Sequence, residues 1–116
     1  MNQMPFEATV HKVQGAAQIE LAGRIDATAE PELDDAFDQA EAVGGSAIRL
    51  NFHKVTFINS TGIALIVGLL ARARKKKVTL EVYGLSEHYR EIFRITRLSD
   101  YMTIYDEPGG SAENLG

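Results

Sequence analysis

The chain contains no cysteine among its 116 residues. This absence excludes disulfide scaffolds, thiol catalysis and thiolate metal sites, and it suits a protein of a reducing compartment. The three histidines, His11, His53 and His88, are scattered along the chain without the spacing of metal ligands. We therefore expect neither a metal ion nor a cofactor.

A surplus of basic residues is also missing. The chain has 12 lysines and arginines against 16 acidic residues, which gives a formal net charge of −4. A nucleic-acid-binding domain normally carries a basic face. The basic residues between positions 72 and 77 fall at the end of a predicted helix, where the helix dipole favours cations. We therefore expect no nucleic-acid partner.

Long hydrophobic runs are absent as well. The longest apolar stretch, residues 63–71, is interrupted by Gly68 and is much shorter than the roughly 20 residues that a membrane-spanning helix needs. Residues 1–5 lack the basic and apolar regions of a signal peptide. These features predict a soluble, cytoplasmic protein that does not associate with a membrane.

The residues that are present predict one α/β domain. A hydrophobic content of 45% over 116 residues supports a single core. Strand-like patterns cover residues 6–13, 17–25, 47–52, 78–83 and 101–105, and helical patterns cover residues 29–43 and the stretches after Ser60 and Ser86. The resulting order, β-β-α-β-α-β-α-β, predicts a mostly parallel sheet that opens with an antiparallel hairpin and is packed against helices.

Helix ends and helix faces can also be predicted. Thr28 and Ser86 stand where helix caps are expected, and glycines at positions 44 and 45 end the first helix. The first helix presents apolar residues to the core at helical spacing, namely Leu33, Phe37, Ala40 and Val43. In the second helix the predicted core stripe is Ile63, Ile66, Val67 and Leu70, with Leu65 and Leu69 beside it.

The turn at residues 57–63 is the feature around which the chain is organised. Its sequence, Phe-Ile-Asn-Ser-Thr-Gly-Ile, reads as the end of a buried strand, a polar turn and the start of a helix. Ser60 in this turn has two possible roles. Its oxygen could cap the helix by accepting a bond from an unpaired amide. The same helix end would also favour a phosphate on Ser60.

Three segments of the chain resemble the STAS domain, the family named for sulphate transporters and anti-sigma factor antagonists. Residues 21–26 match the family's Leu-x-Gly-x-apolar-Asp strand. Residues 57–63 match its apolar-apolar-Asp-Ser-Ser/Thr-Gly-apolar signature, and residues 83–85 match its strand-Gly-Leu turn. The resemblance covers roughly residues 6–105. It implies a STAS domain over residues 1–106. Residues 107–116 contain proline, glycine and serine with little to bury, so we expect them to form a flexible tail.

The resemblance also implies a function. In bacterial anti-sigma factor antagonists, the first hydroxyl residue of the signature is phosphorylated by the anti-sigma factor, a serine kinase; here that residue is Ser60. The unphosphorylated antagonist binds the kinase and frees a sigma factor, the phosphorylated form lets go, and a serine phosphatase resets it. The expected partner-binding residues are Asp26, Asn59, Ser60, Thr61, Gly62, Ile63, Leu65 and Leu69.

Several of these positions keep a second interpretation. The family usually has Asp before the phosphorylated serine, and Asn59 keeps the shape of that residue without its charge. Thr61 is either a second phosphorylation site or a first-turn residue, and Asp26 either lines the site or starts the turn before Thr28. Leu65 and Leu69 either complete the core or are partly exposed and contact the partner.

Two other functions remain to be compared. The first is a non-phosphorylated STAS scaffold, or a regulatory subunit of a transporter or signalling complex. The second is a small hydrolase using Ser60, which would need a base within about 3 Å of the hydroxyl. Ile58 occupies the position where a Gly-x-Ser-x-Gly elbow requires glycine, and there is no Gly-x-x-x-x-Gly-Lys loop. We therefore expect no enzymatic activity.

Overall fold

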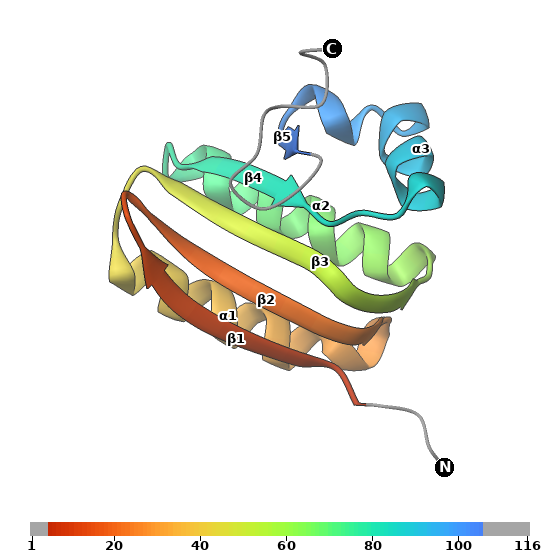
Figure 1. Ribbon diagram of the computed structural model, residues 1–116, viewed down its shortest axis with the longest axis horizontal. Coiled ribbons are helices and arrows are strands. Elements are labelled where there is room, and N and C mark those ends of the chain that lie inside the picture. The colour runs from red at the N-terminus through yellow and green to blue at the C-terminus, as the bar shows by residue number, and fades with distance from the viewer. Residues whose placement is uncertain (1–4, 106–116) are drawn as a thin grey trace.

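The computed structural model describes residues 5–105, and its elements follow in the predicted order (Figure 1). The strands are β1 (Glu7–Val13), β2 (Ala16–Ile25), β3 (Ala47–Ile58), β4 (Thr79–Tyr83) and β5 (Thr103–Tyr105). The helices are α1 (Glu30–Val43), α2 (Ser60–Lys75) and α3 (Glu87–Ile95), with 3-10 turns η1 (Ala27–Ala29) and η2 (Leu98–Asp100). The predicted tail, residues 107–116, lies outside the described residues.

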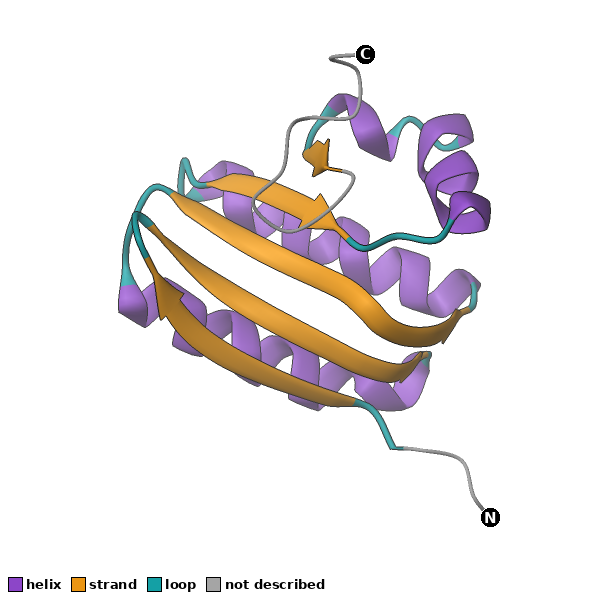
Figure 2. Ribbon diagram, in the orientation of Figure 1, coloured by secondary structure: helices purple, strands orange, loops and turns teal. Residues whose placement is uncertain are grey.

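One five-stranded sheet in the order β1-β2-β3-β4-β5 forms the centre of the domain. β1 and β2 form the predicted antiparallel hairpin, and the other neighbouring strands are parallel. α1 and α2 lie side by side behind one face of the sheet, and α3 lies beyond its β4 side (Figure 2). Within residues 5–105, no helix has the length and hydrophobicity required to cross a membrane.

The core lies between the sheet and the helices, because alternate residues of the central strands point toward α1 and α2. Ile19, Leu21 and Ile25 of β2 are buried, as is Leu50 of β3. The predicted core residues of α1 are buried too, except for Val43, which is partly buried against the core.

The sheet face without helices carries polar side chains that bond across strands. Arg49 Nε of β3 lies 2.8 Å from Glu81 Oε1 of β4. The Tyr83 hydroxyl of β4 reaches past β3 to the Gln18 side-chain oxygen of β2. These bonds connect the strands far from the turn that follows β3.

Two predictions about the helices were wrong. Thr28 does not cap α1: the Asp26 side chain caps η1, and α1 begins at Glu30 after this extra turn, without a side-chain cap. In α2, Leu69 is only 2% exposed and Val67 is 43% exposed, so the core face is rotated from the predicted stripe. The reason is that α2 is apolar on most sides, so docking against the sheet decides which apolar residues are buried.

Candidate functional site

The end of β3 passes into α2 through Asn59, and Asn59, not Ser60, is the helix cap. Its backbone is extended, and its Oδ1 accepts a hydrogen bond of 2.9 Å from the Gly62 amide. Its carbonyl oxygen accepts the first helical bond, 2.9 Å long, from the Ile63 amide. The amide oxygen of an asparagine fills this role as well as a serine hydroxyl does.

Ser60 is therefore not required for capping. It is the first residue of α2, and its side chain is exposed. Among residues 5–105, its hydroxyl has no hydrogen-bond partner, and Thr61 beside it is also exposed. The first amides of the helix lie at this end, so the local field favours negative charge.

Capping by Asn59 leads to a prediction about stability. Asn59→Ala is expected to lower the free energy of unfolding by about 1 kcal/mol, because the Gly62 amide loses its acceptor. Asn59→Asp keeps that acceptor and is expected to stay within about 0.5 kcal/mol of the wild type. Urea denaturation measures both, with Ser60→Ala as the control that should change little. If Ser60→Ala lowered the free energy of unfolding as much as Asn59→Ala does, the assignment of Asn59 as the helix cap would be contradicted.

Gly62 brings the start of α2 directly onto the end of β2. A Cβ atom at Gly62 would lie 2.0 Å from the carbonyl oxygen of Ile25, so only glycine fits there. The same oxygen accepts a bond of 3.3 Å from the Asn59 amide. Gly62 is buried, and the lack of a side chain allows this close approach. Its expected place among the partner-contacting residues stays a prediction.

Asp26 follows Ile25, so it lies at the same edge of the sheet as the Ser60 turn. The Asp26 carboxylate accepts hydrogen bonds from the Thr28 hydroxyl (2.5 Å) and the Thr28 amide (3.0 Å). Arg24 Nε lies 3.7 Å from the other carboxylate oxygen. The bonds from Thr28, together with the Arg24 charge, lower the pKa of Asp26. Asp26 is therefore negatively charged at neutral pH.

The exposed side of α2 continues from Ser60 as a strip of small apolar residues. We call this strip the α2 outer face; it consists of Ala64, Val67, Gly68 and Ala71, all exposed. Each of these residues lies three or four positions from another member of the strip, and Ala64 lies four positions after Ser60. This spacing keeps all of them on one side of the helix, in line with Ser60. Leu65 and Ile63 are partly buried at its margins, whereas Leu69 points into the core. Of the two interpretations of Leu69, the structure therefore agrees with the core position and contradicts partial exposure to a partner.

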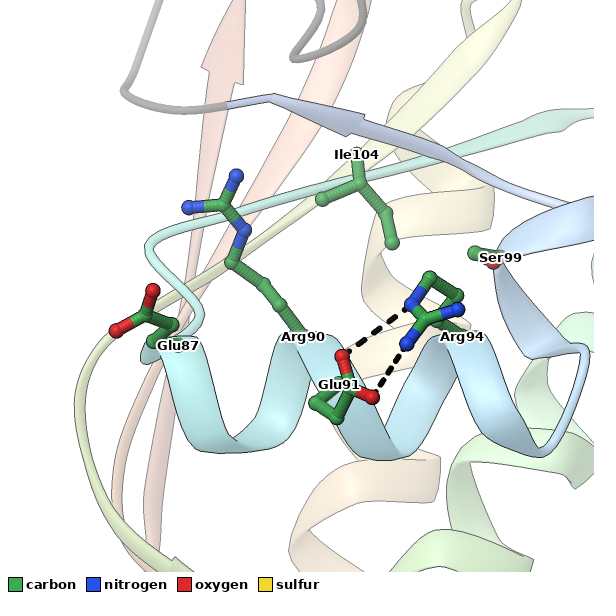
Figure 3. A pocket seen from close by; sticks show the side chains of 6 residues that line it. All are labelled: Glu87, Arg90, Glu91, Arg94, Ser99 and Ile104. Atoms are coloured by element: carbon green, nitrogen blue, oxygen red, sulfur yellow. Dashed lines mark hydrogen bonds and ion pairs between the residues drawn. The ribbon is translucent and has the colours of Figure 1, made fainter.

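A hollow of about 310 Å³ beside α3 is separate from this turn (Figure 3). Its charged lining consists of Glu87, Arg90, Glu91 and Arg94, and Arg94 pairs with Glu91 through Nε at 3.2 Å. Two acids and two bases leave it without a net charge that would attract an ionised ligand. Within the described residues, no group of three or more His, Asp or Glu side chains is arranged to hold a metal ion.

A hydrolase would need a base bonded to the Ser60 hydroxyl. Within residues 5–105, no side chain bonds this hydroxyl. Two residues of this region were not predicted from the sequence. Val67 was placed in the core, and Tyr89, whose hydroxyl bonds the Ile58 amide, was not singled out. No local pattern could have revealed that long-range bond.

Comparison with curated proteins finds relatives with one common description. The anti-sigma-B factor antagonist of Listeria monocytogenes is 32% identical over 89 residues, which cover 77% of this chain and 78% of the relative. The anti-sigma-B factor antagonist of Staphylococcus epidermidis is 29% identical over 87 residues, covering 75% and 81% of the two chains.

Solved structures have the same fold at lower identity. An anti-sigma factor antagonist from Mycobacterium paratuberculosis superposes with a TM-score of 0.75 at 19% identity, covering 89% of this chain and 87% of that one. The antagonist SpoIIAA in its unphosphorylated form gives a TM-score of 0.68 at 18% identity, covering 90% of each chain. Phosphorylated SpoIIAA from Bacillus gives 0.65 at 20% identity, covering 89% and 93%.

The family model of the STAS domain matches residues 7–109, which include every helix and strand described above. The match extends over most of the chain. The sequence motifs, the mixed sheet and the capped turn after β3 are thus accounted for together: the chain belongs to the STAS domain family.

Proposed function

We propose that this chain is an anti-sigma factor antagonist that is switched by phosphorylation of Ser60. The observation that carries the proposal is the position of the Ser60 hydroxyl at the start of α2: it is exposed and has no bond to any residue from 5 to 105, while Asn59 caps the helix. A residue that the fold does not need can be modified without unfolding the domain. The description of the relatives as anti-sigma-B factor antagonists supports the same function.

The physical basis of the switch is a change of charge at the edge of a contact surface. A phosphate on Ser60 would add about −1.5 to −2 charges, which the helix end stabilises locally. The α2 outer face continues directly from Ser60 and offers the apolar area against which a partner would pack. The carboxylate of Asp26 adds negative charge at the same edge. A partner fitted to the neutral turn would then meet a bulky anion.

The partners follow from this scheme. In its unphosphorylated form the chain would bind an anti-sigma factor that is a serine kinase, and this binding would free the sigma factor. Phosphorylation of Ser60 would end the binding, and a serine phosphatase would restore it. SpoIIAA, whose fold is similar, has been solved in both phosphorylated and unphosphorylated forms. These partners would place the chain in the cytoplasm, and the chain itself would act by binding and not as an enzyme.

Three versions of the chain, used as baits in the cytosol of its own cell, test the proposal. Wild type and Ser60→Ala are expected to retain a serine kinase, identified by mass spectrometry, and Ser60→Asp is expected to bind it at least tenfold more weakly, a difference of about 1.4 kcal/mol. The retained kinase with Mg²⁺ and ATP should phosphorylate wild type at Ser60 and leave Ser60→Ala unmodified. Equal retention of one transporter or scaffold protein by all three baits would instead identify a non-phosphorylated scaffold.

A further inference from the structure

Among residues 5–105, no strand pairs with the last part of β3 on the side that faces α3. β4 pairs with β3 only as far as Asn51, opposite Tyr83, while β3 continues to Ile58. The chain leaves the sheet at Gly84, whose φ is +82°, and a Cβ there would lie 2.7 Å from the His53 amide nitrogen. The main-chain groups of β3 just before the Ser60 turn therefore need another partner on this side.

The Tyr89 hydroxyl of α3 is that partner. It accepts a hydrogen bond of 2.8 Å from the Ile58 amide and donates one of 3.4 Å to the Ile58 carbonyl oxygen. The next amide, that of Asn59, points the opposite way and bonds Ile25 of β2 at 3.3 Å. The two residues that lead into the turn are thus held from both sides, one by α3 and the other by β2.

The packing of α3 directs the Tyr89 side chain toward Ile58 at the end of β3. Ser86 caps the helix by accepting a bond of 3.3 Å from the Tyr89 amide. Phe93 is fully buried and packs edge-on against Phe52 of β3, with the ring centroids 6.2 Å apart. These contacts lie on the sheet side of α3, so the Tyr89 ring is directed toward β3 by a helix that is already attached to it.

We propose that Tyr89 is a positioning residue for the reaction at Ser60. By holding both main-chain groups of Ile58, its hydroxyl sets the direction in which Asn59 enters α2, and thereby where the Ser60 hydroxyl points. This inference rests on the proposed phosphorylation of Ser60. Tyr89 would affect the orientation of the Ser60 hydroxyl toward the phosphate donor. The α2 outer face would provide the contact that binds the kinase.

Tyr89→Phe tests the proposal because it removes only the hydroxyl. With the kinase retained by the wild-type bait, kcat for phosphorylation of Ser60 is expected to fall roughly tenfold while KM changes less than twofold, since a misplaced nucleophile slows the chemical step. The matched control is Tyr83→Phe, which removes a hydroxyl bonded to Gln18 on the opposite face of the sheet. That variant is expected to leave both kcat and KM at the wild-type level.

Amide hydrogen exchange gives a second readout that needs no kinase. In Tyr89→Phe the Ile58 and Gly62 amides are expected to exchange at least tenfold faster than in Tyr83→Phe. The exchange rates of the slowest core amides are expected to be the same in both variants. A fall in kcat that is equal in the two variants, or a wild-type kcat in Tyr89→Phe, would overturn the positioning role. Failure of the kinase to modify wild type would refute the proposed function. If the Ile58 and Gly62 amides then also exchanged at the same rate in Tyr89→Phe as in Tyr83→Phe, the role of Tyr89 in holding the turn would be refuted as well.

Discussion

Gly62→Ala is expected to lower the free energy of unfolding by about 3 kcal/mol, at the upper end of what an added methyl group costs in a tightly packed site. The added Cβ would lie 2.0 Å from the Ile25 carbonyl oxygen and 2.9 Å from its carbon. Both obstacles are main-chain atoms of a central strand, so neither can rotate away. Relief would require α2 to move off β2, which would disturb the Asn59 cap and the Ser60 turn.

Gly68→Ala is the matched control, because it makes the same change on the same helix. A Cβ at Gly68 meets nothing within 4 Å, and Gly68 has ordinary helical geometry within α2. Alanine is the better helix former by about 1 kcal/mol, so this variant is expected to be more stable than wild type by up to that amount. Urea denaturation of the two variants should give shifts of opposite sign. Destabilisation by both would mean that α2 tolerates no added volume at all.

Val67→Arg is expected to weaken binding of the proposed kinase partner by about a hundredfold, or 2.7 kcal/mol. Val67 is the largest side chain of the α2 outer face, and 43% of it is exposed. It lies two helical turns from Ser60, so a partner that covers the turn and the outer face would have to bury the new charge. Since the site is exposed in the free domain, stability should change by less than about 0.5 kcal/mol.

Ile95→Arg provides the comparison for this second prediction. Ile95 is an apolar side chain of α3 that is 65% exposed, and it does not belong to the α2 outer face. Arginine there is expected to leave partner affinity within twofold of wild type. Titration calorimetry with the captured kinase measures both variants. If Ile95→Arg weakens binding as much as Val67→Arg, the partner contacts a different surface; if neither does, α2 beyond its first turn is not part of the interface.

The order of elements and the position of the turn could be predicted from sequence because both depend on local patterns. Period-2 alternation marks β2 and β3, and apolar residues at helical spacing mark the inner face of α1. The residues of the turn are polar or small between two apolar runs, which locates a strand-to-helix junction at Ser60. The antiparallel hairpin and the parallel strands then follow from the lengths of the connections.

The assignment of the cap could not be made from sequence. Asn59, Ser60 and Thr61 are all capable of capping a helix, so propensity does not choose among them. The choice depends on where β3 stops pairing, and that is decided by the bonds of the Ile58 and Asn59 amides to α3 and β2. Only the tertiary structure therefore shows that no residue in the described part of the chain bonds the Ser60 hydroxyl.

The sequence by itself determined the class of fold, the place of the turn and the serine in it. Tertiary structure alone decided that α2 buries Leu69 and exposes Val67, that Gly62 abuts Ile25 and that Tyr89 holds Ile58. The physical reason is the same in each case. Local patterns specify what a segment forms and whether it is apolar, but the rotation of an almost wholly apolar helix and a bond spanning 31 positions depend on how the packed elements fit together.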